Sequence, residues 1–490
     1  MSAKEHLDVL IVGAGLSGIG AAWHLQKNCP TKSYAILEAR AASGGTWDLF
    51  RYPGVRSDSD MYTLGYRFKP WVDEKSIADG PTILNYIRET AAENGIDKQI
   101  RYDCRVVRAD WSSDDAVWTV QVERGGVFET LTAAFVMMCS GYYSYADGYR
   151  PDFAGTSEFA GRIVHPQFWP DDLEYTGKTI VVIGSGATAV TLVPALADLG
   201  AHVVMLQRSP TYVASRPGID KGAIRLSKWL PSRMAYGITR WKNVLIGSFL
   251  FNLARKKPAA FKRRLIDMVR AQLGPDYDVG KHFTPSYNPW DQRLCAVPDD
   301  DLFKAIRSGK AEVVTDTIDT FTEDGIRLSS GKFLPADLVV TATGLTLNAL
   351  GDVALAVDGV PVDVSRTMSY KGMMFSDVPN LSYVFGYTNA SWTLKADLTS
   401  DYVCRMLNMM DRRGAAVATP RRGSSDVTEE PLLDFSSGYV MRAHHVLPKQ
   451  GSRKPWKLNQ NYILDLFALK FGRIDDGTLE FSTPARSKAA

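Results

Sequence analysis

The stretch that decides the fold is Val-Leu-Ile-Val-Gly-Ala-Gly-Leu-Ser-Gly at residues 9–18. An apolar strand (residues 8–12) runs into a glycine turn, and a helix continues through residues 21–26. A second strand (residues 34–37) then ends at Glu38. Glycines let the backbone approach a pyrophosphate at the start of the helix, where free N–H groups and the helix dipole attract anions. This order of elements predicts a dinucleotide site.

The residues of this first site follow from the turn and the strand after it. Glu38 lies 20 residues beyond Gly18, where a carboxylate usually binds the ribose hydroxyls. A chance glycine turn in an α/β sheet is the alternative interpretation. The residues expected to bind the nucleotide are Gly13, Gly15, Ser17, Gly18 and Glu38.

A second unit repeats this plan with one informative change. Ile-Val-Val-Ile-Gly-Ser-Gly-Ala-Thr-Ala at residues 180–189 precedes a strand at residues 202–206, and Arg208 follows where an acid would stand. Arginine can pair with a 2′-phosphate that an acid would repel, which favours NADPH over NADH. A solvated surface arginine is the alternative. The residues expected to bind this nucleotide are Gly184, Ser185, Gly186, Ala187, Thr188, Ala189, Arg208 and Ser209.

The two halves also match downstream. Residues 135–141 and 338–344 are both apolar strands that end in a small residue and glycine, as where a chain crosses between domains near a cofactor. An internal duplication of nucleotide-binding folds explains both. We therefore predict an α/β protein with two Rossmann-like, three-layer dinucleotide-binding domains and a helical insertion in the second. The expected boundaries are residues 1–145 and 345–490 for the first (FAD) domain, 146–344 for the second (NADPH) domain, and about 215–285 for the insertion.

Composition limits the class of protein. The 490 residues include 45% apolar and 23% charged residues, which is ordinary for a soluble globular chain of two or three domains. A formal charge of +3 is too small to indicate nucleic-acid binding. The five cysteines have no C-x-x-C or metal-ligand spacing, so we expect no metal site and no redox disulfide. Without a leader or a long apolar run, a cytoplasmic location is expected.

One segment departs from this average. Residues 221–270 carry thirteen Lys/Arg against one acid, Asp267, with apolar residues at helical spacing. Its basic face could touch the anionic inner face of a membrane, which would make the protein peripheral. A solvated face that caps the active site is the interpretation we favour. The tail beyond Arg413 is expected to wrap the surface.

Two more stretches carry chemistry. Gly-Gly-Thr-Trp at residues 44–47 precedes Tyr-Pro-Gly-Val-Arg-Ser-Asp at residues 52–58. The small residues allow close backbone approach, Trp47 offers a flat apolar surface, and Asp58 follows a rigid Pro-Gly turn. This arrangement could hold a flavin ring beside a charge, although a structural loop would have the same composition.

The chain resembles type I Baeyer–Villiger monooxygenases, class B flavoproteins that use FAD, NADPH and O₂. Their pattern F-x-G-x-x-x-H-x-x-x-W-[P/D] is met from Phe159 to Pro170. The pattern [A/G]-G-x-W-x-x-x-x-[F/Y]-P-[G/M]-x-x-x-D is met at residues 44–58. Within this family, similarity to the mycobacterial ethionamide-activating FAD-containing monooxygenases runs along the chain, including residues 46–54, 287–295 and 389–397.

The resemblance implies a reaction. One oxygen atom of O₂ would be inserted beside a ketone or aldehyde carbonyl through a C4a-peroxyflavin, giving an ester or lactone. Sulfoxidation or thioamide oxidation is implied as a side activity. A heteroatom (S/N) flavin monooxygenase is the main alternative. A non-catalytic NADPH/flavin redox sensor is a second, and the presence of Asp58 and Arg293 counts against it.

The resemblance also assigns roles by position. Arg293 matches the family's active-site arginine, and Asp58 would pair with it. A guanidinium is permanently charged and would stabilise the anionic intermediate and the negatively charged adduct. A purely structural salt bridge is the alternative. The remaining residues assigned to cofactor binding are Thr46, Trp47, Asp48, Leu49, Arg56, Ser57, Asp58 and Val106.

Three further positions qualify this assignment. Gln292 stands where many family members have a lysine that helps to hold the nucleotide phosphate. More of the 2′-phosphate is therefore left to Arg208 and Ser209, and a weaker preference for NADPH is expected. His165 lies in a linker motif whose resemblance implies domain coupling more than proton transfer. Trp392 fits either the wall of the substrate or nicotinamide pocket or a buried core.

Overall fold

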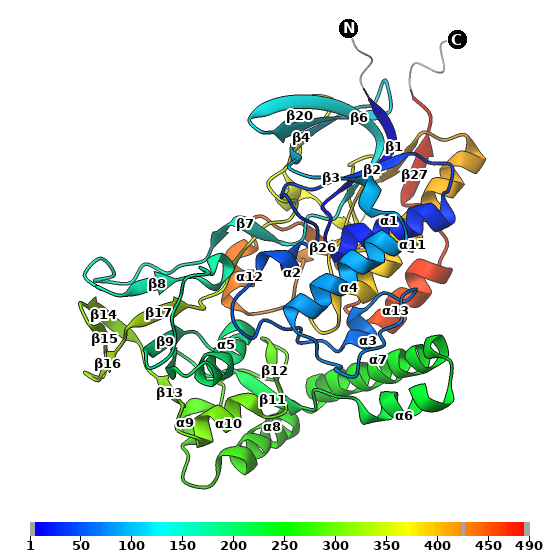
Figure 1. Ribbon diagram of the computed structural model, residues 1–490. Coiled ribbons are helices and arrows are strands. Elements are labelled where there is room, and N and C mark those ends of the chain that lie inside the picture. Colours follow the sequence, from blue (N-terminus) through cyan, green and yellow to red (C-terminus); the bar gives the residue numbers. More distant parts are fainter. Residues whose placement is uncertain (1–4, 424–426, 485–490) are drawn as a thin grey trace.

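The computed structural model describes residues 5–423 and 427–484. Two α/β units lie side by side, and helices of an insertion extend beneath the first unit (Figure 1). The first unit carries both ends of the described chain. Among the described residues, no helix combines the length and apolar character needed to cross a bilayer.

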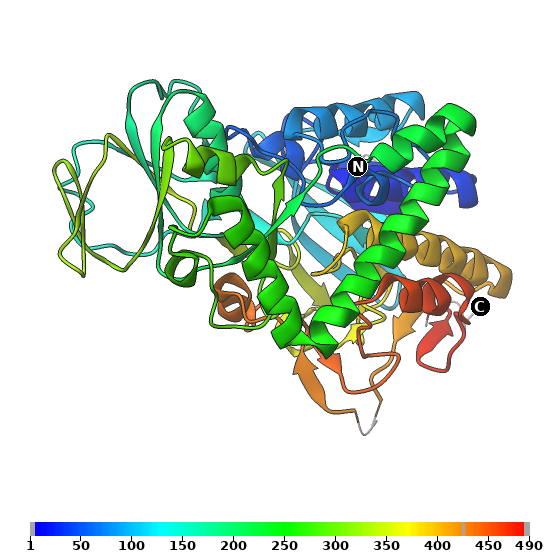
Figure 2. The same ribbon diagram turned by 90° about the horizontal axis from the view of Figure 1, so that it is seen from below.

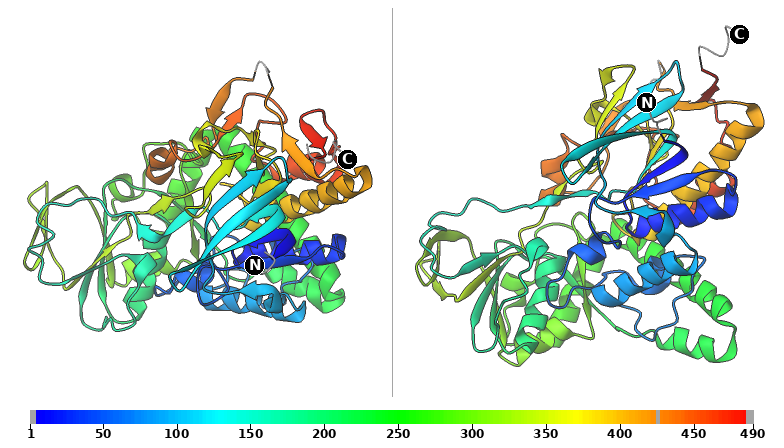
Figure 3. Two further views of the ribbon diagram at one scale, coloured as in Figure 1. Left: turned by 90° about the horizontal axis from the view of Figure 1, so that it is seen from above. Right: turned by 45° about the horizontal axis from the view of Figure 1, so that its top comes forward.

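The first unit is built on a mixed sheet. Its strand β1 is buried from Val9 to Val12 and pairs in parallel with β2 and β6, which explains why these four residues are all apolar. Strands β4, β5 and β6, drawn in cyan shades in Figure 3, continue the sheet as an antiparallel meander. The strands, in the order β20-β19-β4-β5-β6-β1-β2-β3 with β23 beside β6, are β1 (His6–Val12), β2 (Tyr34–Leu37), β3 (Ile100–Arg101), β4 (Arg105–Ser112), β5 (Val117–Arg124), β6 (Val127–Met138), β19 (Ala354–Val357), β20 (Val360–Pro361) and β23 (Leu381–Tyr383).

Helices cover one face of this sheet. Helix α1 (Leu16–Asn28) starts directly after the first glycine turn and packs along α11 (Trp392–Arg413), so a distant part of the chain completes the first layer. The main apolar core lies between these helices and the sheet. The other helical elements here are α2 (Thr46–Leu49), α3 (Met61–Leu64), α4 (Gly80–Glu93) and η1 (Asp97–Gln99).

The second unit repeats the plan with a parallel sheet. Strand β9 (Thr179–Ile183) leads through the second glycine turn into α5 (Ala187–Asp198), and a small meander closes one side. The sheet, in the order β13-β10-β9-β17-β8, and its partners comprise β8 (Arg162–Val164), η2 (Pro166–Phe168), β10 (His202–Gln207), β13 (Ala311–Thr315), β14 (Ile318–Thr322), β15 (Gly325–Leu328), β16 (Phe333–Pro335), β17 (Leu338–Thr341) and α10 (Asp301–Arg307).

The chain crosses twice between the units, at the two strand ends noted in the sequence. Strand β7 (Tyr143–Gly148) leaves the first sheet and β18 (Leu345–Leu347) returns to it, and the two pair antiparallel. The crossings therefore form one double-stranded connection. It lies next to the functional residues described below.

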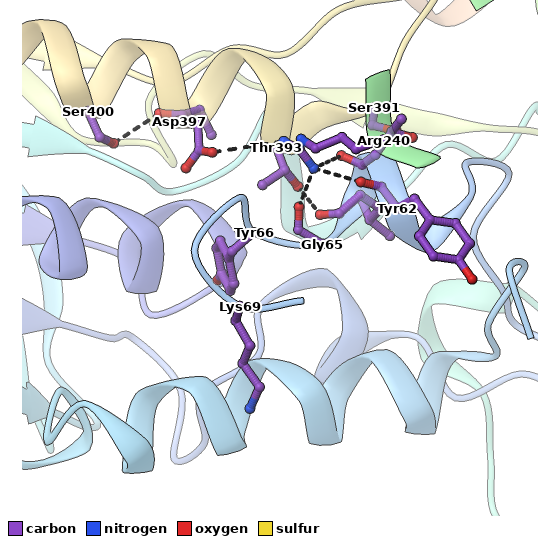
Figure 4. Close-up of polar contacts among 12 residues, drawn as sticks. Tyr62, Gly65, Tyr66, Lys69, Arg240, Ser391, Thr393, Asp397 and Ser400 are labelled. Atoms are coloured by element: carbon purple, nitrogen blue, oxygen red, sulfur yellow. Dashed lines mark hydrogen bonds and ion pairs between the residues drawn. The ribbon is translucent and has the colours of Figure 1, made fainter. Parts of the chain in front are cut away.

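The insertion lies between β11 (Tyr212–Arg216) and β12 (Leu294–Pro298). Its long helix α7 reaches the first unit, where the buried Arg240 donates through Nη1 to the carbonyl oxygens of Tyr62 and Gly65, both at 2.8 Å (Figure 4). This contact fixes α7 to the first unit. The helices of the insertion are α6 (Lys221–Trp229), α7 (Ser232–Lys256), α8 (Pro258–Leu273) and α9 (Val279–His282).

The tail after α11 does more than wrap the surface. It packs a small core around Leu432, Leu433 and Phe435 against Tyr143 and Leu347 of the crossing strands. The remaining elements are η3 (Val364–Arg366), β21 (Ser369–Tyr370), β22 (Met374–Phe375), β24 (Val417–Pro420), β25 (Glu429–Pro431), α12 (Gly438–Ala443), β26 (Lys449–Gly451), α13 (Tyr462–Asp465), the π-helical turn η4 (Leu466–Phe471) and β27 (Leu479–Ser482).

Candidate active site

A cavity of about 1090 Å³ is lined by residues of both units. Its size suits nucleotide-sized ligands, and a cleft shared by two domains is a common place for a ligand site. Most of the predicted site residues meet there. Those that line the cavity are Gly13, Gly15, Ser17, Glu38, Thr46, Trp47, Arg56, Ser57, Asp58, Val106, Gly184, Ser185, Gly186, Ala187, Thr188, Arg208, Ser209 and Arg293.

The two glycine turns have the same geometry. Gly13 has φ +104°, and a Cβ there would lie 2.6 Å from the Cys139 carbonyl oxygen. Gly184 has φ +135°, and its Cβ would lie 2.3 Å from the Ala342 carbonyl oxygen. The helices that follow begin without a side-chain cap, so their first N–H groups are available to an anion. Each turn is thus a cradle for a phosphate.

Glu38 is held in place at the end of β2. Its Oε2 accepts a hydrogen bond from the Ala14 amide at 2.8 Å, and its Oε1 accepts one from the Arg40 amide at 3.0 Å. Burial raises the pKa of Glu38 above its ordinary value, although these hydrogen bonds oppose the shift. The carboxylate therefore has a fixed orientation at the cavity wall.

Four predicted site residues do not line the cavity. Gly18 packs against the turn itself, because a Cβ there would lie 1.9 Å from the Gly13 carbonyl oxygen. Asp48 is buried and pairs with Arg88, Nη2 to Oδ1, at 2.8 Å. Leu49 packs on the tail core, and Ala189 is fully buried in α5. These four residues support the cavity wall from the protein interior and do not face the cavity.

Arg293 and Asp58 form the ion pair that was expected. Arg293 donates to Asp58 Oδ2 from Nη2 at 2.8 Å and from Nε at 3.2 Å. The Arg293 side chain is 43% exposed, against 19% for Asp58, so the guanidinium is the part that faces the cavity. Partial removal from water by the surrounding protein disfavours the charged guanidinium. The attraction of the Asp58 carboxylate is stronger than this effect, so the pKa of Arg293 is raised. The arginine stays charged at all relevant pH values.

Aromatic hydroxyls surround this pair. Burial raises the pKa of Tyr142, and it raises the pKa of Tyr439 to about 12, so both phenols stay neutral at physiological pH. Burial also raises the pKa of the adjacent Cys295 thiol to about 12, which makes this thiol a poor nucleophile. The Arg293–Asp58 ion pair therefore has neutral hydroxyl and thiol groups beside it.

The second turn offers a cation without a partner. Arg208 is exposed at the cavity and makes no hydrogen bond or ion pair with the rest of the described chain. Ser185 Oγ donates to the Ser209 carbonyl oxygen at 3.0 Å, which orders the strand end beside it. Gln292 also lines the cavity. An exposed arginine next to a phosphate cradle can receive a second phosphate.

His165 does not reach the cavity. Its Nδ1 accepts a hydrogen bond from the Gln167 amide at 3.2 Å, and its Nε2 lies 3.2 Å from the Gly344 carbonyl oxygen, to which it donates. A Cβ at Gly148 would lie 2.2 Å from the ring, so the histidine is packed onto both crossing strands. This position fits the coupling role that was favoured over proton transfer.

Trp392 lines the cavity and is also packed against the core. Its ring stacks on Tyr142 at a centroid distance of 4.8 Å, and its Nε1 donates to Ser17 Oγ at 2.9 Å. Both interpretations of this residue therefore apply. The hydrogen bond joins the start of α11 to the first helix.

Several residues that line the cavity belong to no sequence motif and were not predicted. Tyr439 and Arg442 come from the tail, and Arg442 lies over the Tyr149 ring with its guanidinium carbon 3.3 Å from the ring centroid. Tyr142 follows Gly141, three residues after β6 ends at Met138, so the crossing-strand pattern could have pointed to it. The tail residues carry no comparable signal.

Comparison with known proteins identifies the class. The family model described as flavin-binding monooxygenase-like matches residues 73–350, and a model of an NAD(P)-binding Rossmann-like domain matches residues 11–69. The first match spans more than half of the chain. The chain belongs to the flavin-binding monooxygenase family.

One relative illustrates this membership, and two solved structures share the fold. The FAD-containing monooxygenase EthA of Mycobacterium tuberculosis is 58% identical over 479 residues, covering 98% of each chain. An oxidized steroid monooxygenase bound to NADP has a TM-score of 0.77 at 20% identity, covering 98% of this chain and 100% of the other. Cyclohexanone monooxygenase with bound ε-caprolactone has a TM-score of 0.75 at 19% identity, with the same coverage.

These findings confirm the predicted resemblance and fold class. The chain is a flavin-type monooxygenase related to mycobacterial FAD-containing monooxygenases, and it has two Rossmann-like units. The expected pair of cofactors agrees with the nucleotides named for these proteins. What the family membership leaves open is the reaction and the role of each side chain.

Proposed function

We propose that this protein is an FAD- and NADPH-dependent Baeyer–Villiger monooxygenase. It would insert one atom of O₂ beside a ketone or aldehyde carbonyl, giving an ester or lactone, and it would oxidise sulfides or thioamides as a side activity. The observation that carries the proposal is the Arg293 guanidinium, held by Asp58 on the wall of a cavity that both glycine turns share.

The residues present fit both cofactors. A Cβ at Gly45 would lie 3.0 Å from the Gly15 Cα, so two backbone segments approach each other with no side chain between them. We assign the first turn and Glu38 to FAD, and the second turn with Arg208 to NADPH. The corresponding domains would be residues 1–145 with 345–490, and residues 146–344. The neutral groups Thr46, Trp47 and Ser57 would face the flavin.

The protein's contribution is electrostatic. A bound FAD, once reduced by NADPH, supplies activated oxygen derived from O₂. Arg293 would stabilise negative charge near the flavin and on the substrate oxygen as a carbonyl becomes tetrahedral. Asp58 would orient the guanidinium, and no bond to Arg293 Nη1 from the described side chains is seen, so that edge is available to a ligand. The neutral hydroxyls of Tyr142 and Tyr439 would add hydrogen-bond donors.

The relatives support this reaction without deciding it. Cyclohexanone monooxygenase, whose fold the chain shares, was solved with ε-caprolactone, a lactone. The relative from M. tuberculosis is described only as an FAD-containing monooxygenase. The choice between carbonyl and heteroatom oxidation therefore rests on the site and needs a direct test.

The test is product analysis under ¹⁸O₂. Purified FAD-loaded protein with NADPH would be given a long-chain ketone, a cyclic ketone and an aryl sulfide, and the products analysed by mass spectrometry. We expect one labelled oxygen in the ester or lactone. Arg293→Ala should lower kcat by about 10² to 10³, as for loss of a transition-state donor. Arg162→Ala, which removes an exposed arginine paired with Asp172 at 3.0 Å, serves as the matched control and should not change kcat.

Two outcomes would contradict the proposal. Labelled sulfoxide with no ester or lactone would make the protein a heteroatom monooxygenase. NADPH oxidation that no substrate in the panel accelerates, with no oxygenated product, would favour a redox sensor. Full ester formation by Arg293→Ala would leave the reaction in place but refute the role given to this arginine.

A further inference from the structure

Helix α7 exposes apolar side chains along one face. Most recur at intervals of three or four residues, and the other two are their direct neighbours, which places them all on one side of a helix. Their exposed fractions lie between 40% and 64%, high values for such side chains. Soluble proteins rarely leave a continuous apolar surface of this kind uncovered without a partner. The residues of this α7 stripe are Met234, Ile238, Trp241, Leu245, Ile246, Phe249 and Leu250.

The apolar surface continues on the tail. Trp241 lies beside Tyr462 at the start of α13, with ring centroids 6.1 Å apart. The following turn exposes Phe467 at 63% and Phe471 at 66%. Both views show α13 (red-orange) next to α7 (green) (Figures 1 and 2). Two segments distant in sequence therefore contribute to one apolar surface.

The opposite face of α7 is firmly attached. Ala235, Tyr236 and Arg240 are buried, and Tyr236 donates to the Tyr66 carbonyl oxygen at 3.0 Å. Arg240 Nη2 also lies 3.9 Å from Asp397 Oδ2 of α11 (Figure 4). Because these polar contacts fix how the helix is rotated, the stripe has to point outward.

The segment that carries the stripe is strongly basic, with thirteen Lys/Arg in residues 221–270. The single acid of residues 221–270, Asp267, is paired with Arg270 at 2.8 Å. Two further cations pair with carboxylates outside this segment, Lys242 with Asp220 and Arg255 with Asp291. The exposed cations of residues 221–270 that form no ion pair with the described residues, which we call the basic rim, are Lys221, Arg225, Lys228, Arg233, Lys256, Lys257, Arg263 and Arg264.

We propose that the α7 stripe and the basic rim form a docking surface for an anionic lipid membrane. Helix α7 would lie in the plane of the interface, with the stripe among the upper acyl chains and the rim against the headgroups. An amphipathic helix that carries Trp and Phe on one side and Lys and Arg around it has the composition of such helices. The contact is peripheral and does not require a spanning helix.

The same charges argue against a second copy of the chain. In a two-fold dimer built on the stripe, each basic rim would meet the rim of its partner. Juxtaposed like charges at an interface are costly. An anionic surface complements both features, whereas a symmetric partner complements only the apolar one.

The experiment is co-sedimentation of the FAD-loaded full-length protein with lipid vesicles. Vesicles of phosphatidylcholine alone would be compared with vesicles that contain phosphatidylglycerol, at low and high salt. We expect binding to the anionic vesicles that weakens as salt screens the rim. Trp241→Ser with Phe249→Ser should weaken this binding by at least about tenfold, because two buried aromatic side chains are lost.

Matched variants separate the surface from general effects. Phe128→Ser with Phe333→Ser removes two aromatic side chains exposed at 59% and 40% elsewhere on the molecule, and binding should not change. Arg233→Glu with Lys257→Glu should weaken binding by at least about fivefold for each cation replaced. Lys98→Glu with Lys310→Glu replaces exposed lysines outside the insertion and should have little effect. FAD absorbance would confirm that each variant is folded.

Three results would overturn the proposal. Wild-type protein that stays in the supernatant with anionic vesicles would refute it directly. Equal losses from the stripe variants and the Phe128/Phe333 control would show that the stripe has no special role. An oligomer in sedimentation velocity that Trp241→Ser with Phe249→Ser converts to monomer, without vesicle binding by the wild type, would assign the surface to a second copy.

Discussion

Arg255, one residue before the end of α7, donates from Nη1 to Asp291 Oδ1 at 2.8 Å, two residues before Arg293. The main-chain oxygen of Asp291 accepts from the amide and hydroxyl of Ser436, both at 2.9 Å. Asp291 thus joins the insertion, the loop that carries Arg293 and the tail. The position of Arg293 depends on elements that are far apart in the sequence.

The Arg255–Asp291 pair should therefore matter for catalysis more than for stability. An exposed ion pair contributes only about 0–1 kcal/mol to folding. A displacement of about 1 Å at an active site can cost about 10²-fold in rate. We expect Arg255→Ala to lower kcat about tenfold while the thermal midpoint hardly moves, measured by NADPH-coupled turnover and FAD fluorescence.

The control for this prediction is the pair of Arg270 and Asp267. It also joins Nη1 to Oδ1 at 2.8 Å, but it lies within α8. Arg270→Ala should leave both kcat and the midpoint unchanged. The prediction fails if Arg255→Ala and Arg270→Ala give the same kcat.

The first glycine turn should be intolerant of a methyl group for two separable reasons. Gly13→Ala places a Cβ 2.6 Å from the Cys139 carbonyl oxygen and also forces alanine into positive φ. Gly95→Ala imposes positive φ (+64°) but has no atom within 4 Å. The backbone cost alone is about 1–2 kcal/mol. We expect Gly13→Ala to purify without FAD and Gly95→Ala to retain it.

The ratio of flavin to protein absorbance measures this directly. Full FAD occupancy in Gly13→Ala would mean that the turn relaxes and is not the close contact that we infer. Loss of FAD from Gly95→Ala as well would show that backbone strain anywhere in the first unit is enough to prevent FAD binding.

Arg208 should set the preference for NADPH. It is exposed at the second turn without a partner among the described residues, so its removal breaks no internal contact. Charge-assisted hydrogen bonds to a phosphate are worth about 1.5–3 kcal/mol. Arg208→Ala should therefore raise KM for NADPH about 10- to 100-fold and leave KM for NADH nearly unchanged. Equal effects on the two nucleotides would contradict this assignment.

Gln292 allows the reverse experiment. It lines the same cavity and stands where many family members have a lysine. Gln292→Lys should lower KM for NADPH relative to NADH and partly rescue Arg208→Ala. A rescue that is equally large for NADH would indicate a general electrostatic effect.

Local sequence predicted the parts of the site that a few neighbouring residues create. Each glycine turn needs positive φ and space for a ligand, and both requirements are visible in Gly13 and Gly184 themselves. The crossing strands were visible too, because a strand that ends in glycine marks where the chain leaves a sheet. The pairing of Asp58 with Arg293 was different, since it joins residues 235 positions apart and came only from family resemblance.

What sequence could not predict depends on long-range packing. The apolar spacing of α7 indicates an amphipathic helix but not which side faces solvent. An arginine is usually expected on the exposed side of such a helix, but Arg240 is buried and the apolar stripe is exposed. Tyr439 reaches the cavity because the tail folds back on the crossing strands. Asp48 was assigned by family resemblance, and its burial and its pairing with Arg40 and Arg88 come from packing that the sequence does not show.

His165 makes the stability of the protein depend on pH. Burial lowers the pKa of this histidine below its ordinary value, although its bond to the Gly344 carbonyl oxygen opposes the shift. Nδ1 is the acceptor for the Gln167 amide, so protonation would remove that hydrogen bond. Because the unfolded state takes up the proton more readily, the stabilisation is complete above the unfolded pKa of about 6.5 and is lost as pH falls toward the folded pKa.

We therefore expect the free energy of unfolding to drop between pH 7.5 and pH 5.5 by less in His165→Gln than in the wild type. The difference between the two drops is at most about 1.4 kcal/mol per pH unit, since one proton is involved. Urea unfolding at both pH values measures it, and only the change with pH is compared, because the substitution also alters packing. Burial lowers the pKa of His282 as well, so His282→Gln should also reduce the loss of unfolding free energy on acidification. The reductions from the two single variants should add in the double variant, because the two sites are independent. An unchanged drop in His165→Gln would show that this ring does not control acid stability.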